Sequence, residues 1–199
     1  MTNDEQYESA VRLITSLGSD RNEAEGGRLL ESAANAGHAK AQALLGSMLR
    51  SRGEIGKAIE WLQKAADAGD TDAQVELGMV YGDPNGSLRE YGKANACWKS
   101  AARSGNGVAM SNLAMLYANG LGVKRSPTKA VLLLMVAAEL GNSPALGILK
   151  EVAPTLPRYS TPDAMTRMSA SLQKLQAIAD SGEMKSRCPW VIDNLDNLA

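Results

Sequence analysis

The chain has 199 residues, of which 44% are hydrophobic and only 4% are aromatic, and its 21 Lys and Arg against 22 Asp and Glu give a net charge of −1. This composition is typical of a soluble globular protein and argues against a disordered tail, a disulfide scaffold and a strongly basic nucleic-acid binder. Alanine and glycine are abundant, at 30 and 19 residues, so we expect closely packed helices with small side chains at their contacts.

The N-terminal residues, Met-Thr-Asn-Asp-Glu-Gln, have neither the basic nor the apolar region of a secretory signal. No run of 18 apolar residues occurs, so we predict no membrane-spanning helix. We therefore expect a cytoplasmic protein, although a chain whose signal peptide had been removed would look the same and would be periplasmic. The two cysteines are an isolated, distant pair, which we interpret as a buried thiol at Cys97 and a tail thiol at Cys188.

Four Ala-Ala pairs recur along the chain, starting at residues 33, 65, 101 and 137. The same offset separates each pair from a following glycine, and an alanine and a leucine follow each glycine at fixed spacing. In residues 73–81 and 109–117, Ala, Leu and Tyr recur every four positions, which predicts a helix. Each repeat therefore predicts a helix A after the glycine and a helix B before the next Ala-Ala pair, with B helices at 57–66, 93–102 and 129–138.

The junction between each B helix and the next A helix has its own pattern. The glycine is suited to a left-handed C-cap, and the residue after it is polar and can cap the next helix. His38, the only histidine, occupies this polar position, so we interpret it as a capping residue. The residues at the equivalent position are His38, Asp70, Asn106 and Asn142.

The segment from Ala58 to Tyr81 resembles the core motif of the Sel1-like repeat, a tetratricopeptide-like family, and residues 117–124 resemble its inter-helix loop. The resemblance covers roughly residues 26–158. It implies an all-α, right-handed superhelix (solenoid) of antiparallel helix pairs, with about four repeats and helical caps, that acts as a protein-binding scaffold, often in bacteria. The loop at 51–54 is shorter than the family pattern, and the loop at 82–86 lacks its Gly-x-Gly-Val.

We divide the chain into an N-terminal helical cap (1–25), the repeat array (26–158), a C-terminal capping helix (159–182) and a tail (183–199). Helices are predicted at 4–17, at 22–36 and at about 161–179, the last with an apolar face. Residues 1–27 carry a net charge of −4 and residues 28–158 a net charge of +4, so an acidic cap precedes a mildly basic array. In the tail, Trp190 and Leu195 either fold back on the array or contact a partner. The apolar face comprises Met165, Met168, Leu172, Leu175 and Ile178.

No pattern in the sequence indicates catalysis. One histidine and two distant cysteines do not make a zinc site, and residues 120–126 do not fit the phosphate-binding P-loop. We therefore predict no catalytic residue, metal or cofactor.

The resemblance implies that the A helices line a concave groove, with partner contacts at positions off the Ala-Leu-Tyr stripe. This surface would be basic at one end, with Val and two Met in its middle; the alternative is that Met79 and Met115 are ordinary packing residues. The expected groove residues are Lys40, Ala43, Ser47, Arg50, Asp72, Val75, Met79, Val108, Ser111, Met115 and Asn119.

The leading hypothesis is a non-enzymatic scaffold or adaptor that binds a peptide or a folded protein in this groove. One alternative is an immunity or chaperone-type protein that neutralises or escorts a secreted effector. Two others are an enzyme with an unrecognised site and a homo-oligomer joined through the tail. We expect a protein partner, no nucleic acid, and a monomer.

Overall fold

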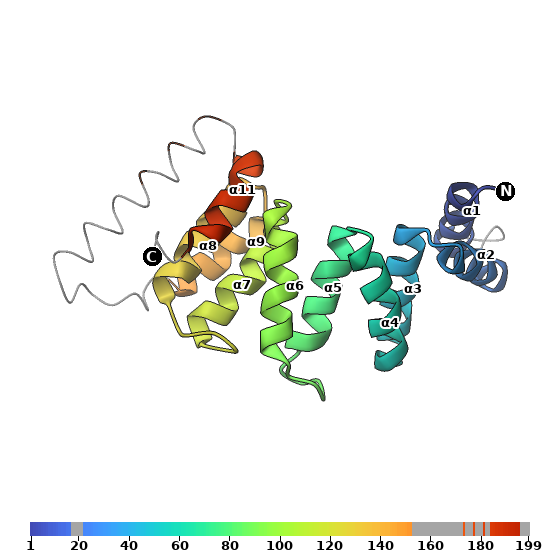
Figure 1. The fold of residues 1–199 in the computed structure, drawn as a ribbon, viewed down its shortest axis with the longest axis horizontal. Helices are drawn as coiled ribbons and strands as arrows, with labels where there is room; N and C mark the ends of the chain where they lie inside the picture. The colour runs from blue at the N-terminus through green and yellow to red at the C-terminus, as the bar shows by residue number, and fades with distance from the viewer. Residues whose placement is uncertain (17–21, 153–172, 174–176, 178–180, 182–183, 196–199) are drawn as a thin grey trace. The chain divides into compact units, whose positions relative to one another are not determined.

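The computed structural model describes residues 1–16, 22–152, 173, 177, 181 and 184–195, and these residues form helices and no strand. The prediction of an all-α fold is therefore confirmed. The A helices predicted from the repeat are α3, α5, α7 and α9, the helix predicted at 4–17 is α1, and the B helices are α2, α4, α6 and α8 (Figure 1). The bounds are α1 Asn3–Thr15, α2 Glu23–Asn35, α3 Ala39–Ser51, α4 Ile55–Asp67, α5 Thr71–Gly82, α6 Tyr91–Arg103, α7 Gly107–Asn119, α8 Pro127–Glu139, α9 Ser143–Val152 and α11 Met184–Asp193.

The chain forms two compact units, Met1–Val80 (unit 1) and Tyr81–Ala199 (unit 2). In unit 1, α1 packs on α2, α2 on α3 and α3 on α4 (Figure 1). In unit 2, α6 packs on α7, α7 on α8 and α8 on α9. Helices that follow one another in the chain are thus neighbours in space, which is the arrangement of a helical repeat array.

The four predicted junctions have the same geometry. Each glycine has a positive φ, at 89° in Gly37, 87° in Gly69, 81° in Gly105 and 83° in Gly141. Its N–H and that of the next residue donate to the carbonyls of the second and the first alanine of the Ala-Ala pair, which is the Schellman pattern. The polar residue then accepts from the backbone N–H three residues later, at distances of 2.8 to 3.2 Å, so the predicted capping is confirmed at all four junctions.

Small residues allow the helices to approach closely. The first alanine of each pair is fully buried, and so are Ala58, Ala94 and Ala130 on the same B helices. A Cβ placed on Gly46 of α3 would lie 2.6 Å from Leu62 Cγ of α4, closer than real Cβ contacts come. The abundance of Ala and Gly in the sequence therefore has a packing cause.

The loops inside the repeats differ in length, as the sequence predicted. Residues 52–54 join α3 to α4, whereas residues 83–90 join α5 to α6 and residues 120–126 join α7 to α8. Gly120 ends α7 in the left-handed conformation, and Gly122 lies so close to Tyr91 that a Cβ on it would be 2.6 Å from Tyr91 Cβ. The glycines of residues 117–124 thus serve the loop's close contact with the start of α6.

The C-terminal tail folds back onto the array. Helix α11 packs against α6, with Cys188, Val191, Ile192 and Leu195 buried (Figure 1). Arg103 of α6 donates from Nε and Nη2 to Asp193 Oδ1, at 2.8 and 2.6 Å. Of the two alternatives for the tail, this favours fold-back, and it buries the tail thiol of Cys188.

Some predictions fall on parts that the structure does not describe. The capping helix at 161–179, with Met165, Met168, Leu172, Leu175 and Ile178, lies outside the described residues apart from residues 173 and 177. The side chain of Trp190 lies outside them as well. The division of the chain at residues 25, 158 and 182 stays a prediction.

Candidate binding surface

The exposure of the predicted groove residues divides them into three groups. Exposed residues are Lys40, Asp72, Val108, Met115 and Asn119, half-buried ones are Ala43, Ser47, Arg50 and Met79, and buried ones are Val75 and Ser111. The burial of the last two corrects the expectation that these side chains are exposed.

The physical reason is that helices inside the array are covered on more than one side. In α5 the buried side chains point in several directions around the helix, among them Val75, Leu77 and Val80. Helix α7 contacts α6, α8 and α9, so Ser111 is enclosed between neighbours. Fewer side chains of these A helices are therefore exposed than the resemblance to the Sel1-like repeat implied.

In unit 1, the predicted residues surround a cavity of about 380 Å³. Three successive A helices, α1, α3 and α5, contribute its walls. Lys40, Ala43, Ser47 and Asp72 were among the predicted groove residues, and the structure brings these four together. The lining residues are Tyr7, Lys40, Ala43, Leu44, Ser47, Asp70, Asp72 and Glu76.

Four lining residues were not among the groove residues predicted from the sequence: Tyr7, Leu44, Asp70 and Glu76. Tyr7 lies on α1, which the sequence reasoning placed in the N-terminal cap, although α1 packs on α2 as an A helix packs on its B helix. Glu76 follows Asp72 by four positions and therefore shares its helical face, a signal that was available.

The charges at the cavity have clear partners in only two cases. Arg50 Nε lies 2.8 Å from Glu76 Oε2, joining α3 to α5, and Asp70 Oδ1 accepts from the Ala73 N–H at 2.8 Å. Lys40 and Asp72 are exposed and form no ion pair with any described residue. Three carboxylates and one ammonium line the cavity. The lining therefore has more acidic than basic groups, whereas the sequence predicted a basic end of the groove.

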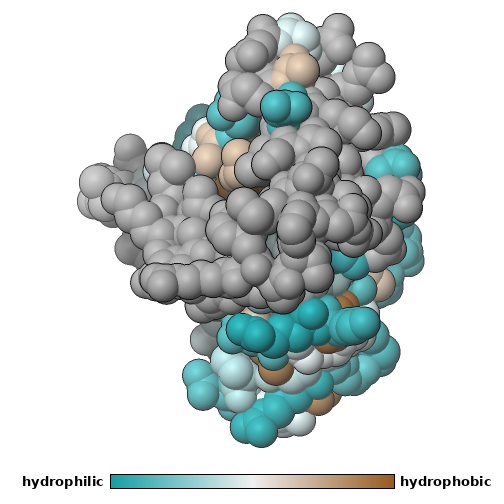
Figure 2. Space-filling model, turned by 90° about the vertical axis from the view of Figure 1, so that its left-hand side faces the viewer, coloured by the Kyte–Doolittle hydropathy of each residue, from teal (hydrophilic) through white to brown (hydrophobic). Residues whose placement is uncertain are grey.

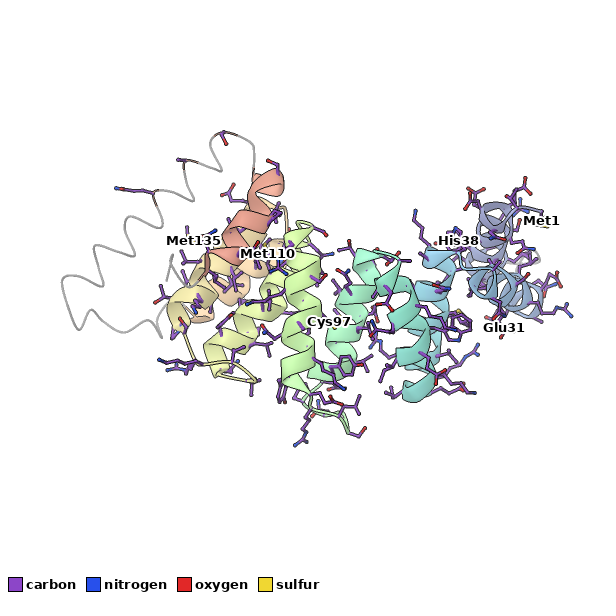
Figure 3. The ribbon with its side chains drawn as sticks, in the orientation of Figure 1. Met1, Glu31, His38, Cys97, Met110 and Met135 are labelled. Carbon is purple, nitrogen blue, oxygen red and sulfur yellow. The ribbon has the colours of Figure 1, made fainter. Side chains whose placement is uncertain are left out.

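The aromatic wall of the cavity is held in place by the first junction. The ring of Tyr7 stacks on that of His38, with centroids 4.7 Å apart. Nδ1 of His38 accepts from the Ala41 N–H at 3.0 Å, and Nε2 lies 3.1 Å from Asp4 Oδ1. Figure 3 shows His38 at the start of α3. The capping residue thereby fixes a side chain of the candidate site.

In unit 2, the A helix α7 presents a different surface. Val108 and Met115 are 44% and 40% exposed and lie on one face of α7, with the buried Ser111 between them. The Ser111 hydroxyl and the Asn112 side-chain nitrogen have no hydrogen-bond partner among the residues that the structure describes. In the view of Figure 2, the hydrophobic residues of the described surface form small separate areas among hydrophilic ones.

Two observations on the described side chains bear on metal binding and on thiol reactivity. No three or more His, Cys, Asp or Glu among them could hold a metal ion together. Cys97 on α6 is half-buried, and burial raises the pKa of its thiol, which disfavours the reactive thiolate (Figure 3). No described helix has the length and apolar character needed to cross a membrane.

Two curated bacterial proteins are similar to part of this chain. The chain is 38% identical over 71 residues to the Sel1-repeat-containing protein YjcO of Escherichia coli K12 and, equally, to YjcO of Shigella flexneri. This match covers 36% of the chain but only 31% of each relative, so the chain corresponds to about a third of their length.

Two solved structures share the fold. One is c5321, described as a protective antigen of uropathogenic E. coli with an SLR fold; it has a TM-score of 0.76 and 26% identity, over 93% of this chain and 40% of that one. The other is a Sel1 repeat protein of Oxalobacter formigenes, with a TM-score of 0.69 and 25% identity, over 82% of this chain and 67% of that one.

The model of the Sel1 repeat matches this chain at residues 6–38, 39–70, 71–106 and 107–142. The four matches coincide with the helix pairs α1–α2, α3–α4, α5–α6 and α7–α8, so α1 and α2 make up the first repeat. Sel1 repeats generally mediate protein–protein interactions, and the fold is typically a non-catalytic scaffold. The chain belongs to the Sel1-repeat family, and its fold is an all-α solenoid of four repeats.

Proposed function

We propose that this protein is a non-enzymatic scaffold or adaptor that binds a segment of a partner protein at the cavity of unit 1. The observation that carries the proposal is the meeting of α1, α3 and α5 around about 380 Å³ of open space. Pockets that bind small ligands have volumes of about 300–1,000 Å³, so a cavity of this size suits a short part of a peptide rather than a whole domain.

The chemistry of the lining supports a peptide as the occupant. Tyr7 and Leu44 supply apolar surface, and Ser47 supplies a hydroxyl. Lys40 and Asp72 supply charges that form no ion pair within the described part of the chain. A peptide offers both apolar side chains and backbone groups to such a mixed wall. No group of the described side chains could hold a metal ion, and burial raises the pKa of the Cys97 thiol, which disfavours the reactive thiolate. Both observations fit a binding role.

Filling the cavity tests the proposal. Ser47→Trp places a large side chain in the wall, and Glu60→Trp on the exposed side of α4 is the matched control. Each immobilised variant is incubated with extract of cells that naturally produce the protein, and the retained proteins are quantified by mass spectrometry. We expect a partner that the unchanged protein and Glu60→Trp retain and that Ser47→Trp loses.

If all three proteins retain the same partners in the same amounts, the cavity is not the binding site. The identity of the retained partner separates an adaptor from an immunity or chaperone role, because only the latter two require a secreted effector.

A further inference from the structure

The cavity of unit 1 has a chemical asymmetry that selects its occupant. Its carboxylates, Asp70, Asp72 and Glu76, all belong to α5 or to the cap that begins it. Its apolar surface comes from α1 and α3, through Tyr7 and Leu44. Carboxylates from one helix and apolar side chains from two others therefore line the same space of about 380 Å³, to which α3 also contributes the ammonium of Lys40.

The three carboxylates at the cavity, together with Lys40 and Arg50, carry a net charge of −1. Glu76 is neutralised by Arg50 at 2.8 Å, and Lys40 can offset one of the two remaining carboxylates. Asp70 is committed to the Ala73 N–H, whereas the exposed Asp72 has no ion-pair partner among the described residues. Asp72 is thus the group available to an incoming cation.

Long basic side chains have matching chemistry, since they bury an aliphatic stem on apolar surface while the charged head reaches a carboxylate. A guanidinium or ammonium can also lie over an aromatic face, and Tyr7 supplies an aromatic ring to the cavity lining. An acidic side chain entering the same space would be repelled by the net negative charge of these groups.

We infer that the occupant is a peptide segment with an arginine or lysine, whose stem lies between Tyr7 and Leu44 and whose charged head pairs with Asp72. This inference rests on the proposed function and adds that the bound segment carries a positively charged side chain.

A peptide library tests the inference. Random peptides displayed on phage are selected on the full chain, and only peptides that lose binding to Ser47→Trp are kept as cavity ligands. We expect arginine or lysine at one position in these peptides. Asp72→Lys should weaken their binding about tenfold, because it replaces an attraction by a repulsion, and Lys40→Glu should strengthen it.

Glu60→Lys on the exposed side of α4 makes the same charge change away from the cavity and should leave the affinity unchanged. Circular dichroism establishes that each variant is folded. Cavity ligands rich in aspartate or glutamate, which Lys40→Glu weakens, would overturn the inferred charge while leaving the proposed function standing. If no selected peptide depends on Ser47, both the inference and the proposed function are wrong.

Discussion

At the scale of single residues, the closeness of the helices depends on a few positions that tolerate no side chain. Gly46 lies against Leu62, and Gly26 and Gly82 are similarly enclosed, with the nearest side-chain atom at 2.7 Å from an added Cβ in both. Other glycines, such as Gly56 in α4, have no atom within 4 Å of an added Cβ. The same substitution should therefore have opposite effects at the two kinds of position.

Gly46→Ala should lower the free energy of unfolding by about 1–3 kcal/mol, because the added methyl forces Leu62 or the backbone of α4 to shift. Gly56→Ala is the matched control and should be neutral or stabilising by up to about 1 kcal/mol, since alanine favours the helix. Urea unfolding followed by circular dichroism measures both. Equal stability of the two variants would show that α3 and α4 are less tightly packed than described.

Cys97 makes a second prediction at this scale. Burial raises the pKa of its thiol, so at neutral pH the native protein holds less thiolate than an exposed cysteine does. Alkylation by iodoacetamide should therefore be slower in the native protein than in guanidinium, and the native rate should start to rise at a higher pH. The modified peptide is identified by mass spectrometry, which separates Cys97 from Cys188. Equal rates in both states would contradict the described burial.

At the scale of elements, the junctions between repeats explain where helices end and begin. A glycine with positive φ and a polar cap recur four times, and the caps are two asparagines, one aspartate and His38. These caps use only local sequence, which is why the sequence predicted them. His38 differs from the others because it also contacts Tyr7 and Asp4.

Replacing His38 separates these roles. His38→Ala removes the cap of α3 and should cost about 1 kcal/mol of unfolding free energy, whereas His38→Asn should recover most of it, as asparagine caps α7. Thermal unfolding of the two variants measures the difference. If His38→Asn is no more stable than His38→Ala, the cap hydrogen bond contributes little, and the stacking on Tyr7 matters more.

Helix α11 is the element whose place depends on long-range contacts. Val191 is fully buried in unit 2, so Val191→Asp would bury an uncompensated charge and should detach α11 from α6. Hydrogen exchange should then accelerate across residues 184–193 while α3 and α4 keep their protection. Asp193→Ala is the milder control, because its partner Arg103 is 51% exposed and such pairs contribute about 0–1 kcal/mol. Unchanged exchange of α11 in Val191→Asp would refute its docking.

At the scale of the whole molecule, the repeat could be predicted because the Ala-Ala pair and the glycine after it recur four times in the sequence. The cavity could not, because it depends on how closely α1, α3 and α5 approach, and no local pattern encodes that distance. Tyr7 shows the difficulty, since its segment lacks the repeat's Gly and Ala landmarks and was assigned to a cap. Val75 and Ser111 illustrate the opposite error. They occupy positions that the repeat register assigns to an exposed groove, and yet neighbouring helices bury them.

Photo-crosslinking tests whether a partner protein binds at the cavity of unit 1. The photo-crosslinking residue benzoylphenylalanine replaces Ser47 in the full chain, in cells that naturally produce the protein, and the same residue at Glu60 is the control. Irradiation should attach a partner protein at Ser47 and none at Glu60, and Asp72→Lys should reduce the crosslink at Ser47. Crosslinking of equal yield at both positions, or of no protein at Ser47, would show that the partner does not bind at the cavity.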